Sequence, residues 1–189
     1  MYVLLCGFEI IPQTVSLRDI GHRFVVSVPI TAYLFDTDRG WVLFDAGMDE
    51  RHVRDPGQVD KLFVASGWLP PPVIRPEHEM GAQLAEIGIG FGDISTVILS
   101  HLHADHSGHI KRMTEARLVI QRAEHDYAFW PGAKLSWFRE DYMLPDLHWD
   151  IIEGDREIMP GMRTLFTPGH SPGHQSLVVD LPRTGTVIL

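Results

Sequence analysis

The sequence of 189 residues has 44% hydrophobic and 22% charged residues, a composition that excludes a disordered or fibrous chain and fits one globular domain spanning residues 1–189. The formal net charge of −9 argues against the large basic surface on which sequence-independent nucleic-acid binding depends. No apolar stretch approaches the roughly 18 residues of a membrane span, so neither nucleic acid nor a membrane is expected as a partner.

Apolar runs rich in Val, Ile and Leu predict the strands. They cover residues 2–8, 24–35, 41–44, 96–99, 117–121, 162–167, 176–181 and 186–189. Turn residues at 36–40 and at 182–185 predict a hairpin at each of these places. The first run contains the single cysteine, Cys6, which cannot form an internal disulfide and is predicted to be a buried, unreactive thiol in a cytoplasmic protein.

Helical patterns are fewer. Apolar residues repeat at helical spacing over residues 80–87, and Gly88 ends this segment. Weaker helical patterns cover residues 123–130 and 138–144, and each stops before a proline. The order of strands and helices favours an α/β sandwich whose sheet is largely covered by helices.

Residues 51–75 interrupt this alternation with several prolines and glycines. We expect an irregular excursion there, because these residues punctuate regular structure. A long loop in a compact domain often serves as a lid over a functional site.

The residues with the clearest chemistry follow the apolar run at 96–99. They read His101-Leu102-His103-Ala104-Asp105-His106. In an extended segment, residues two apart face the same way, so His101 and His103 are expected to share one ion, with Asp105 and His106 facing a second. The alternative, that these are surface histidines without a ligand, is disfavoured by their spacing at a strand end.

Imidazole and carboxylate groups suit zinc, and iron, cobalt and manganese bind at similar sites. The cluster contains no cysteine, which a structural zinc site usually uses, so a catalytic site with an open position for water is favoured.

A third ligand for the first ion is expected from the Pro- and Gly-rich stretch at 167–174. His170 is preferred as the ligand, and His174 is predicted to support the site from outside the ligand set. Asp45, which follows the run at 41–44, is predicted to orient a metal-bound imidazole, with a turn-capping role as the alternative. The remaining histidines are predicted to have no role in the site: His22, His52, His78, His109, His125 and His148.

The cluster matches the HxHxDH motif of the metallo-β-lactamase superfamily. Within that superfamily, the chain resembles the N-acyl-homoserine lactone lactonases, which degrade quorum-sensing signals, from Pro29 to Leu189. The motifs that carry this resemblance are Ser100–Gly108, Ile151–Asp155, Pro160–Gly161 and Thr167–Leu177.

The resemblance implies an αββα sandwich with a dinuclear centre, holding two zinc ions in the complete protein. It assigns His101, His103 and His170 to the first ion, and Asp105 and His106 to the second. After the last predicted strand, the family pattern continues with an Asp that bridges the ions, a Tyr and a final His. This sequence ends at Leu189, before those three positions. We therefore expect the chain to be a fragment that lacks the last strands and helices of the fold.

The function implied is hydrolysis of the lactone ring of N-acyl-homoserine lactones, through attack by a metal-bridging hydroxide. Asp105 is expected to act both as a ligand and as the group that carries the proton. The acyl tail of such a substrate needs an apolar groove, for which Leu62, Phe63 and Trp68 are candidates, unless these side chains pack the excursion onto the core.

Two alternatives to this function stay open. One is a thioester hydrolase of the glyoxalase II type, which uses the same metal ligands. The other is a metal-binding fragment or scaffold without catalysis. No oligomeric state follows from the sequence.

Overall fold

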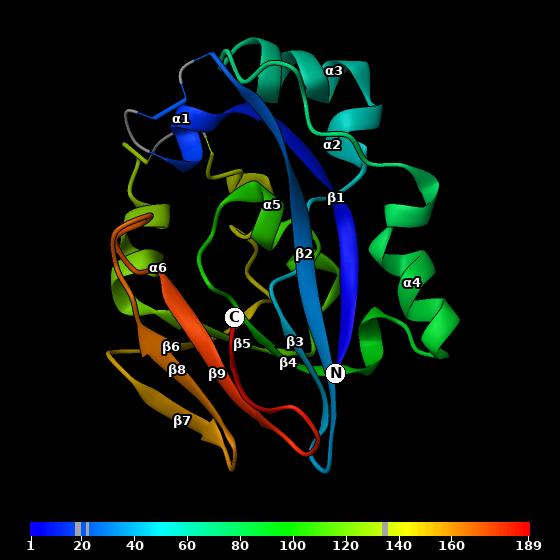
Figure 1. Ribbon diagram of the computed structural model, residues 1–189, viewed down its shortest axis with the longest axis vertical. Coiled ribbons are helices and arrows are strands. Elements are labelled where there is room, and N and C mark those ends of the chain that lie inside the picture. Colours follow the sequence, from blue (N-terminus) through cyan, green and yellow to red (C-terminus); the bar gives the residue numbers. More distant parts are fainter. Residues whose placement is uncertain (18–19, 22, 134–135) are drawn as a thin grey trace.

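Two β-sheets lie face to face in the computed structural model, which describes residues 1–17, 20–21, 23–133 and 136–189 (Figure 1). The six-stranded sheet runs in the order β1 (Tyr2–Pro12), β2 (Val25–Thr37), β3 (Gly40–Phe44), β4 (Ile94–Ile98), β5 (Arg117–Gln121) and β6 (His148–Ile152). The four-stranded sheet runs in the order β10 (Gly185–Ile188), β9 (Gln175–Leu181), β8 (Met162–Phe166) and β7 (Arg156–Met159).

The α-helices of the described residues are short. They are α1 (Gln13–Ser16), α2 (Arg51–Arg54), α3 (Pro56–Val59), α4 (Met80–Ile87), α5 (Ala104–Ser107) and α6 (Arg122–Phe129). A π-helical turn covers Asp60–Val64, and 3₁₀ turns cover Pro76–His78, Phe91–Asp93, Ile110–Arg112 and Arg139–Asp141. None of the helices in this described part of the chain has the length and apolar character that crossing a membrane requires.

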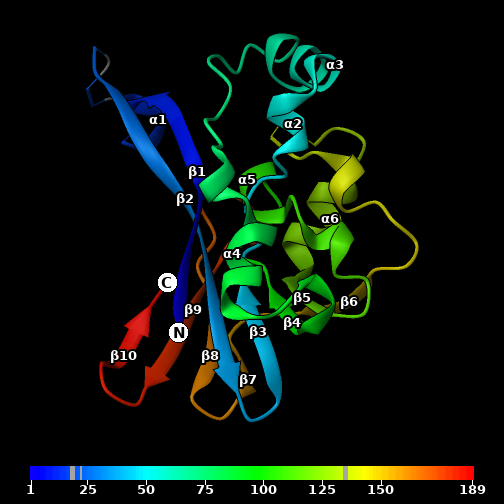
Figure 2. The same ribbon diagram turned by 90° about the vertical axis from the view of Figure 1, so that its right-hand side faces the viewer.

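Side chains alternate between two cores along each inner strand, as the pleat of a strand dictates. On β3, Leu43 faces the helices, whereas its neighbours Val42 and Phe44 face the four-stranded sheet. There they pack against residues such as Leu177 of β9. Figure 2 shows the resulting layers, with α4, α5 and α6 on one side of the six-stranded sheet and β7 to β10 on the other. The predicted α/β sandwich is therefore confirmed.

Parallel strand pairing determines where the candidate site residues lie. Strands β3, β4, β5 and β6 are parallel, so their carboxyl ends lie at one edge of the sheet. Asp45 follows β3, His101 lies three residues after β4, and Glu124 lies three residues after β5. The four-stranded sheet reaches the same edge, because the backbone N–H of Gln175 donates a 2.9 Å hydrogen bond to the carbonyl of Ser100.

Most predicted elements are present. Both predicted hairpins form, between β2 and β3 and between β9 and β10, and α4 ends as predicted at Gly88, which adopts a left-handed conformation with φ of 89°. Strands β6 and β7 were not predicted, because their five and four residues carry charged side chains that mask the apolar pattern. The helix predicted at 138–144 is wrong, since only the 3₁₀ turn Arg139–Asp141 forms there.

The excursion at 51–75 is more regular than predicted, since helices and a π-helical turn occupy residues 51–64. Pro56 does not interrupt the helical structure but occupies the first turn of α3. The Asp55 side chain caps that turn by accepting hydrogen bonds from the backbone N–H groups of Gly57 at 2.8 Å and Gln58 at 3.3 Å. An Asp-Pro-Gly sequence therefore starts a helix here.

Candidate metal centre

Three histidines from the two sheets converge at the common edge. His101 and His103 follow β4, and His170 lies in the loop between β8 and β9. One ring nitrogen from each lies within 4.8 Å of the others. His103 Nδ1 and His170 Nε2 are only 3.1 Å apart.

The nitrogens of this group fit a divalent cation. His101 Nε2 and His103 Nε2 are buried and have no hydrogen-bond partner within the described residues. Burial, assisted by the neighbouring imidazoles, lowers the pKa of His101 well below its usual range. Burial also lowers the pKa of His103 to about 3. Both rings are therefore neutral at pH 7 and offer lone pairs, which is the form that binds a metal.

Asp105 and His106 lie on α5, beside the three histidines. His106 Nε2 is 3.0 Å from Asp105 Oδ2, and His106 Nδ1 is 2.7 Å from Asp45 Oδ2. Burial alone would lower the pKa of His106, but the two carboxylates raise it well above its usual range. Burial likewise opposes ionisation of Asp105, yet His106 lowers the pKa of that carboxyl to about 2. Among the described residues, neither belongs to a group of three or more candidate ligands within 4.8 Å of one another.

Asp45 connects this part of the site to the sheet. Its backbone has φ of 61°, a left-handed conformation that Asp tolerates better than most residues. Its carboxylate accepts hydrogen bonds from the Ser100 backbone N–H at 2.7 Å and from the Ser100 hydroxyl at 2.8 Å. Ser100 Oγ in turn lies 2.9 Å from His101 Nδ1. Asp45 thus contacts His106 directly and His101 through Ser100, which supports an orienting role over a turn cap.

His174 lies beside the three histidines without joining them. Its ring centroid is 5.4 Å from that of His101 and 5.9 Å from that of His170. Its Nδ1 is instead 3.0 Å from Thr167 Oγ1, across the base of the same loop. This placement is consistent with a supporting position outside the ligand set.

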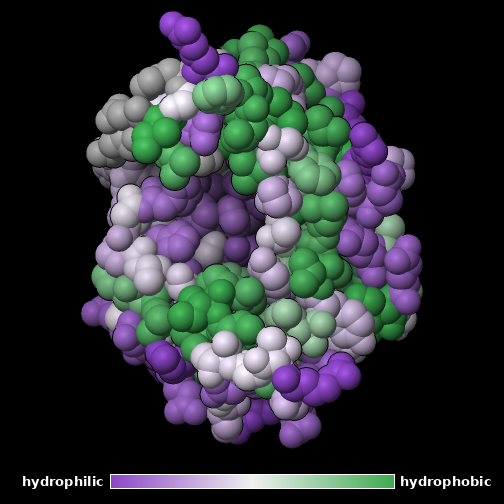
Figure 3. Space-filling model, in the orientation of Figure 1, coloured by the Kyte–Doolittle hydropathy of each residue, from purple (hydrophilic) through white to green (hydrophobic). Residues whose placement is uncertain are grey.

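A cavity of about 480 Å³ opens beside His103 and His170. Its other lining residues are Tyr127, Ser136, Trp137, Gly169, Ser171 and Pro172. Figure 3 shows a hollow with hydrophilic walls near the middle of the face on which Figure 1 draws α5, with hydrophobic residues above and below it.

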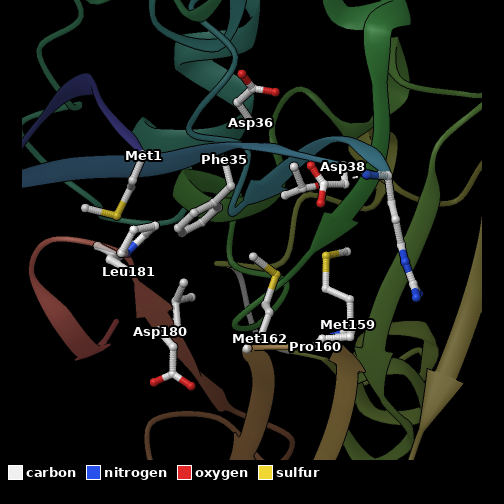
Figure 4. Close-up of a pocket in the computed structure, with 14 residues that line it drawn as sticks. Met1, Phe35, Asp36, Asp38, Met159, Pro160, Met162, Asp180 and Leu181 are labelled. Atoms are coloured by element: carbon white, nitrogen blue, oxygen red, sulfur yellow. Dashed lines mark hydrogen bonds between the residues drawn. The ribbon is translucent and has the colours of Figure 1, made fainter.

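A second cavity, of about 580 Å³, lies between the two sheets near the β2–β3 turn. Phe35 of β2 and Met162 of β8 point toward one another across it (Figure 4). It contains none of the predicted site residues, so its larger volume does not make it the candidate site.

The residues predicted to line a substrate groove lie elsewhere. Leu62 and Phe63 are buried in the core on the helical side of the sheet, and Trp68 is partly buried against it. The Phe63 ring packs 5.2 Å from Trp68 and 5.7 Å from Phe138, measured between ring centroids. None of the three lines the 480 Å³ cavity. Packing of the excursion onto the core, the alternative left open by the sequence, agrees with the positions of Phe63 and Trp68, whereas Leu62 also lines a cavity of about 290 Å³ that shares Trp137 with the larger one.

Two of the histidines predicted to have no role in the site belong to other buried polar groups. His52 Nε2 lies 2.9 Å from Asp141 Oδ1, and His109 Nε2 lies 2.9 Å from Glu50 Oε2. Each pair is separated by more than 50 residues in the sequence, so spacing gave no signal. His22 lies outside the described residues.

Two further buried charged residues, Glu124 of α6 and Lys111, are not indicated by any pattern in the sequence. Glu124 is fully buried and accepts hydrogen bonds from both loops that carry the histidines. Lys111 Nζ lies between the buried carboxylates of Asp49 and Asp141 and contacts both. Lys111, together with Arg51 at Asp49, already supplies two positive charges to these two carboxylates, so we interpret them as an ion-pair network and not as a metal site.

Comparison with known proteins agrees with this geometry. Residues 26–189 match the family model described as the metallo-beta-lactamase superfamily. The N-acyl homoserine lactonase AiiA of Bacillus thuringiensis subsp. kurstaki is 37% identical over 169 residues, covering 87% of this chain and 64% of that protein. The N-acyl homoserine lactonase AttM of Azorhizobium caulinodans is 33% identical over 181 residues, covering 89% of this chain and 66% of that protein.

A solved structure with the same fold is an N-acyl homoserine lactone hydrolase with the product N-hexanoyl-L-homoserine bound at its catalytic metal centre. The TM-score is 0.85 at 32% sequence identity, covering 99% of this chain and 72% of that one. The chain spans slightly less than two thirds of the length of AiiA and AttM, at 64% and 66% respectively.

Proposed function

The chain belongs to the metallo-β-lactamase superfamily, and from this membership we propose that it acts as a metal-dependent hydrolase that opens the lactone ring of N-acyl-homoserine lactones. The observation that carries the proposal is the group of three histidines, two of them buried neutral rings with unpartnered nitrogens, beside a cavity of about 480 Å³. The substrate class comes from AiiA and AttM, which are named N-acyl homoserine lactonases.

We propose that His101, His103 and His170 hold one zinc ion and that Asp105 and His106 contribute to a second. Iron, cobalt and manganese share this preference for imidazole and carboxylate ligands. When bound, the ions supply a water activated for attack near neutral pH and a positive charge that stabilises a developing oxyanion.

Residues of the chain would transfer the proton and orient the ligands. Hydrolysis adds water across the ester bond: the hydroxyl group joins the carbonyl carbon, the bond from that carbon to the ring oxygen breaks, and the ring oxygen gains a proton. Asp105, ionised at neutral pH, is placed to accept a proton from water and to return it to the ring oxygen. Asp45 and Ser100 hold the rings of His106 and His101 in fixed orientations.

The cavity wall suits a substrate with an apolar part. Tyr127, Trp137 and Pro172 line it next to His103 and His170. A glutathione thioester would use the same histidines, so thioester hydrolysis is the competing activity. The similarity to named lactonases favours the lactone.

We also propose a cytoplasmic location. The support is Cys6, the single cysteine, which is buried and free. Burial raises the pKa of its thiol to about 12, so the fold neither uses a disulfide nor exposes a reactive thiolate.

The test combines metal analysis with turnover of N-hexanoyl-homoserine lactone, for the parent and for His103→Ala. The parent should bind zinc and open the lactone, and His103→Ala should lose both zinc and at least about 100-fold in activity. His148→Ala, which removes an exposed histidine of β6, is the matched control and should behave like the parent. Turnover of a glutathione thioester without lactone turnover would favour the competing activity, and a parent without zinc or hydrolysis would favour a scaffold.

A further inference from the structure

Glu124, in the first turn of α6, is a fully buried carboxylate surrounded by donors. Its Oε1 accepts hydrogen bonds from the Leu102 backbone N–H and the Trp137 indole N–H, both at 3.0 Å. Its Oε2 accepts from the Ser171 hydroxyl at 2.6 Å and the Gly173 backbone N–H at 3.1 Å. A carboxylate is costly to bury, and here four donors offset that cost.

The four donors are next to the candidate ligands. Leu102 lies between His101 and His103 in the sequence, and Ser171 follows His170 directly. The Trp137 ring packs edge-on against His103, with 4.1 Å between the ring centroids. One carboxylate is therefore bonded to both loops that supply the histidines, and to the aromatic ring that contacts one of them.

Gly173 shows how closely the second loop approaches the helix. A Cβ atom at Gly173 would lie 2.1 Å from the Glu124 backbone nitrogen, a distance that no side chain tolerates. The loop at 167–174 is thus seated directly on the first turn of α6.

The two sheets have another connection at Gln175, whose side chain donates to the Leu99 carbonyl at 2.8 Å. That bond joins the strand ends, whereas the bonds to Glu124 reach the residues adjacent to the histidines. The Gln175 backbone also bonds to the carbonyl of Ser100, next to His101, but only the bonds to Glu124 reach a residue next to His170 as well as the residue between His101 and His103.

We propose that Glu124 is a positioning residue of the metal centre, and that its carboxylate holds the two loops at the separation at which His101, His103 and His170 share one ion. This inference rests on the proposed metal site. A ligand set divided between two sheets cannot be fixed by local sequence, so it needs a group that is bonded to both.

The proposal requires both carboxylate oxygens, which makes Glu124→Gln informative. With the amide nitrogen toward Ser171 and Gly173, the serine hydroxyl can reverse and accept, but the Gly173 N–H faces another donor. With the amide nitrogen on the other side, it faces the N–H groups of Leu102 and Trp137, neither of which can accept. Glutamine should therefore choose the first orientation and release the loop that carries His170.

The experiment compares zinc affinity, measured by competition with a chromophoric chelator, between the parent, Glu124→Gln and Tyr142→Phe. Tyr142 is the matched control because its hydroxyl is buried and donates to the Ala128 carbonyl of the same helix at 2.9 Å. We expect Glu124→Gln to weaken zinc binding by about 10–100-fold. Tyr142→Phe should lower the melting temperature but bind zinc within about twofold of the parent.

Ser171→Ala is the second variant, because it removes one donor without disturbing the helix and should weaken zinc binding severalfold. It decides the question if Glu124→Gln does not fold. If Glu124→Gln folds and binds zinc as tightly as the parent, the proposal is overturned. If Glu124→Gln does not fold, parent-like zinc affinity in Ser171→Ala overturns it instead. An equal loss of affinity in Tyr142→Phe would overturn it too, because the effect would then be general stability. A parent that binds no zinc would instead refute the proposed metal site.

Discussion

His103 Nδ1 lies 3.1 Å from His170 Nε2, although the two residues belong to loops of different sheets. A cation bound there would connect the two sheets. Binding that is confined to the folded state stabilises that state by mass action, by about 2.7 kcal/mol when the free metal concentration is 100 times Kd. We predict that zinc raises the melting temperature of the parent and that a chelator reverses the rise. His170→Ala should show little rise, and an equal rise in both proteins would contradict the assignment.

A substitution at Lys111 should destabilise the fold without touching the histidines. Its ammonium group lies 2.7 Å from Asp49 and also contacts Asp141, and both carboxylates are almost fully buried. Lys111→Met would remove the ammonium group shared by two buried carboxylates and leave Asp49 with Arg51 and Asp141 with His52, so we expect a loss of up to about 3–5 kcal/mol in the free energy of unfolding. Urea denaturation measures it. The control is Lys61→Met, whose exposed ion pair with Glu140 should contribute less than about 1 kcal/mol.

The same network should make stability depend on acid pH. Burial favours the neutral form of Asp49, but hydrogen bonds from Arg51 and Lys111 outweigh it and hold the pKa of this carboxyl well below its usual value of about 3.9. A lowered pKa in the folded state adds stability above about pH 4, and this contribution is lost as the pH falls further. Urea denaturation from pH 3 to 7 should show a parent that weakens on the acid side, while Asp49→Asn lacks this component. Parallel curves for the two proteins would contradict the prediction.

Two substitutions at Asp45 distinguish its role in orienting His106 from the effect of its left-handed backbone. Asn tolerates the same left-handed backbone but cannot accept hydrogen bonds through both oxygens, whereas Ala also strains the backbone at φ of 61°. We expect Asp45→Asn to fold and to lose about 10–100-fold in lactone turnover, and Asp45→Ala to lose stability as well. The measurements are kcat, zinc content and melting temperature. Unchanged turnover in a folded Asp45→Asn would leave only a turn-capping role.

The sequence was most informative where chemistry is local. His101, His103, Asp105 and His106 are close in the chain, so their spacing after a buried strand indicated one site before any fold was known. His170 was indicated by its loop of Pro and Gly at another strand end. That residues 1–189 form one domain stays a prediction.

Hydrogen-bond and ion-pair partners that are distant in the chain could not be predicted from the sequence. The donors to Glu124 are 13 to 49 residues away, and His52 is 89 residues from Asp141. Nothing in a local pattern distinguishes such a buried acid from a solvated one on a helix. Leu62 and Phe63 illustrate the reverse case, because an apolar side chain that fits a substrate groove fits a core equally well.

The common edge formed by the ends of β3, β4 and β5 has an evolutionary consequence. Strand pairing ends before the edge, so residues beyond it change without altering the register of the sheet. Tyr127, Trp137 and Pro172 line the cavity from such positions. Variation at Tyr127 and Pro172 should change which ring or acyl tail is accommodated while the strands stay constant, and libraries for altered selectivity are best placed there, whereas Trp137 also donates to Glu124 and is best kept.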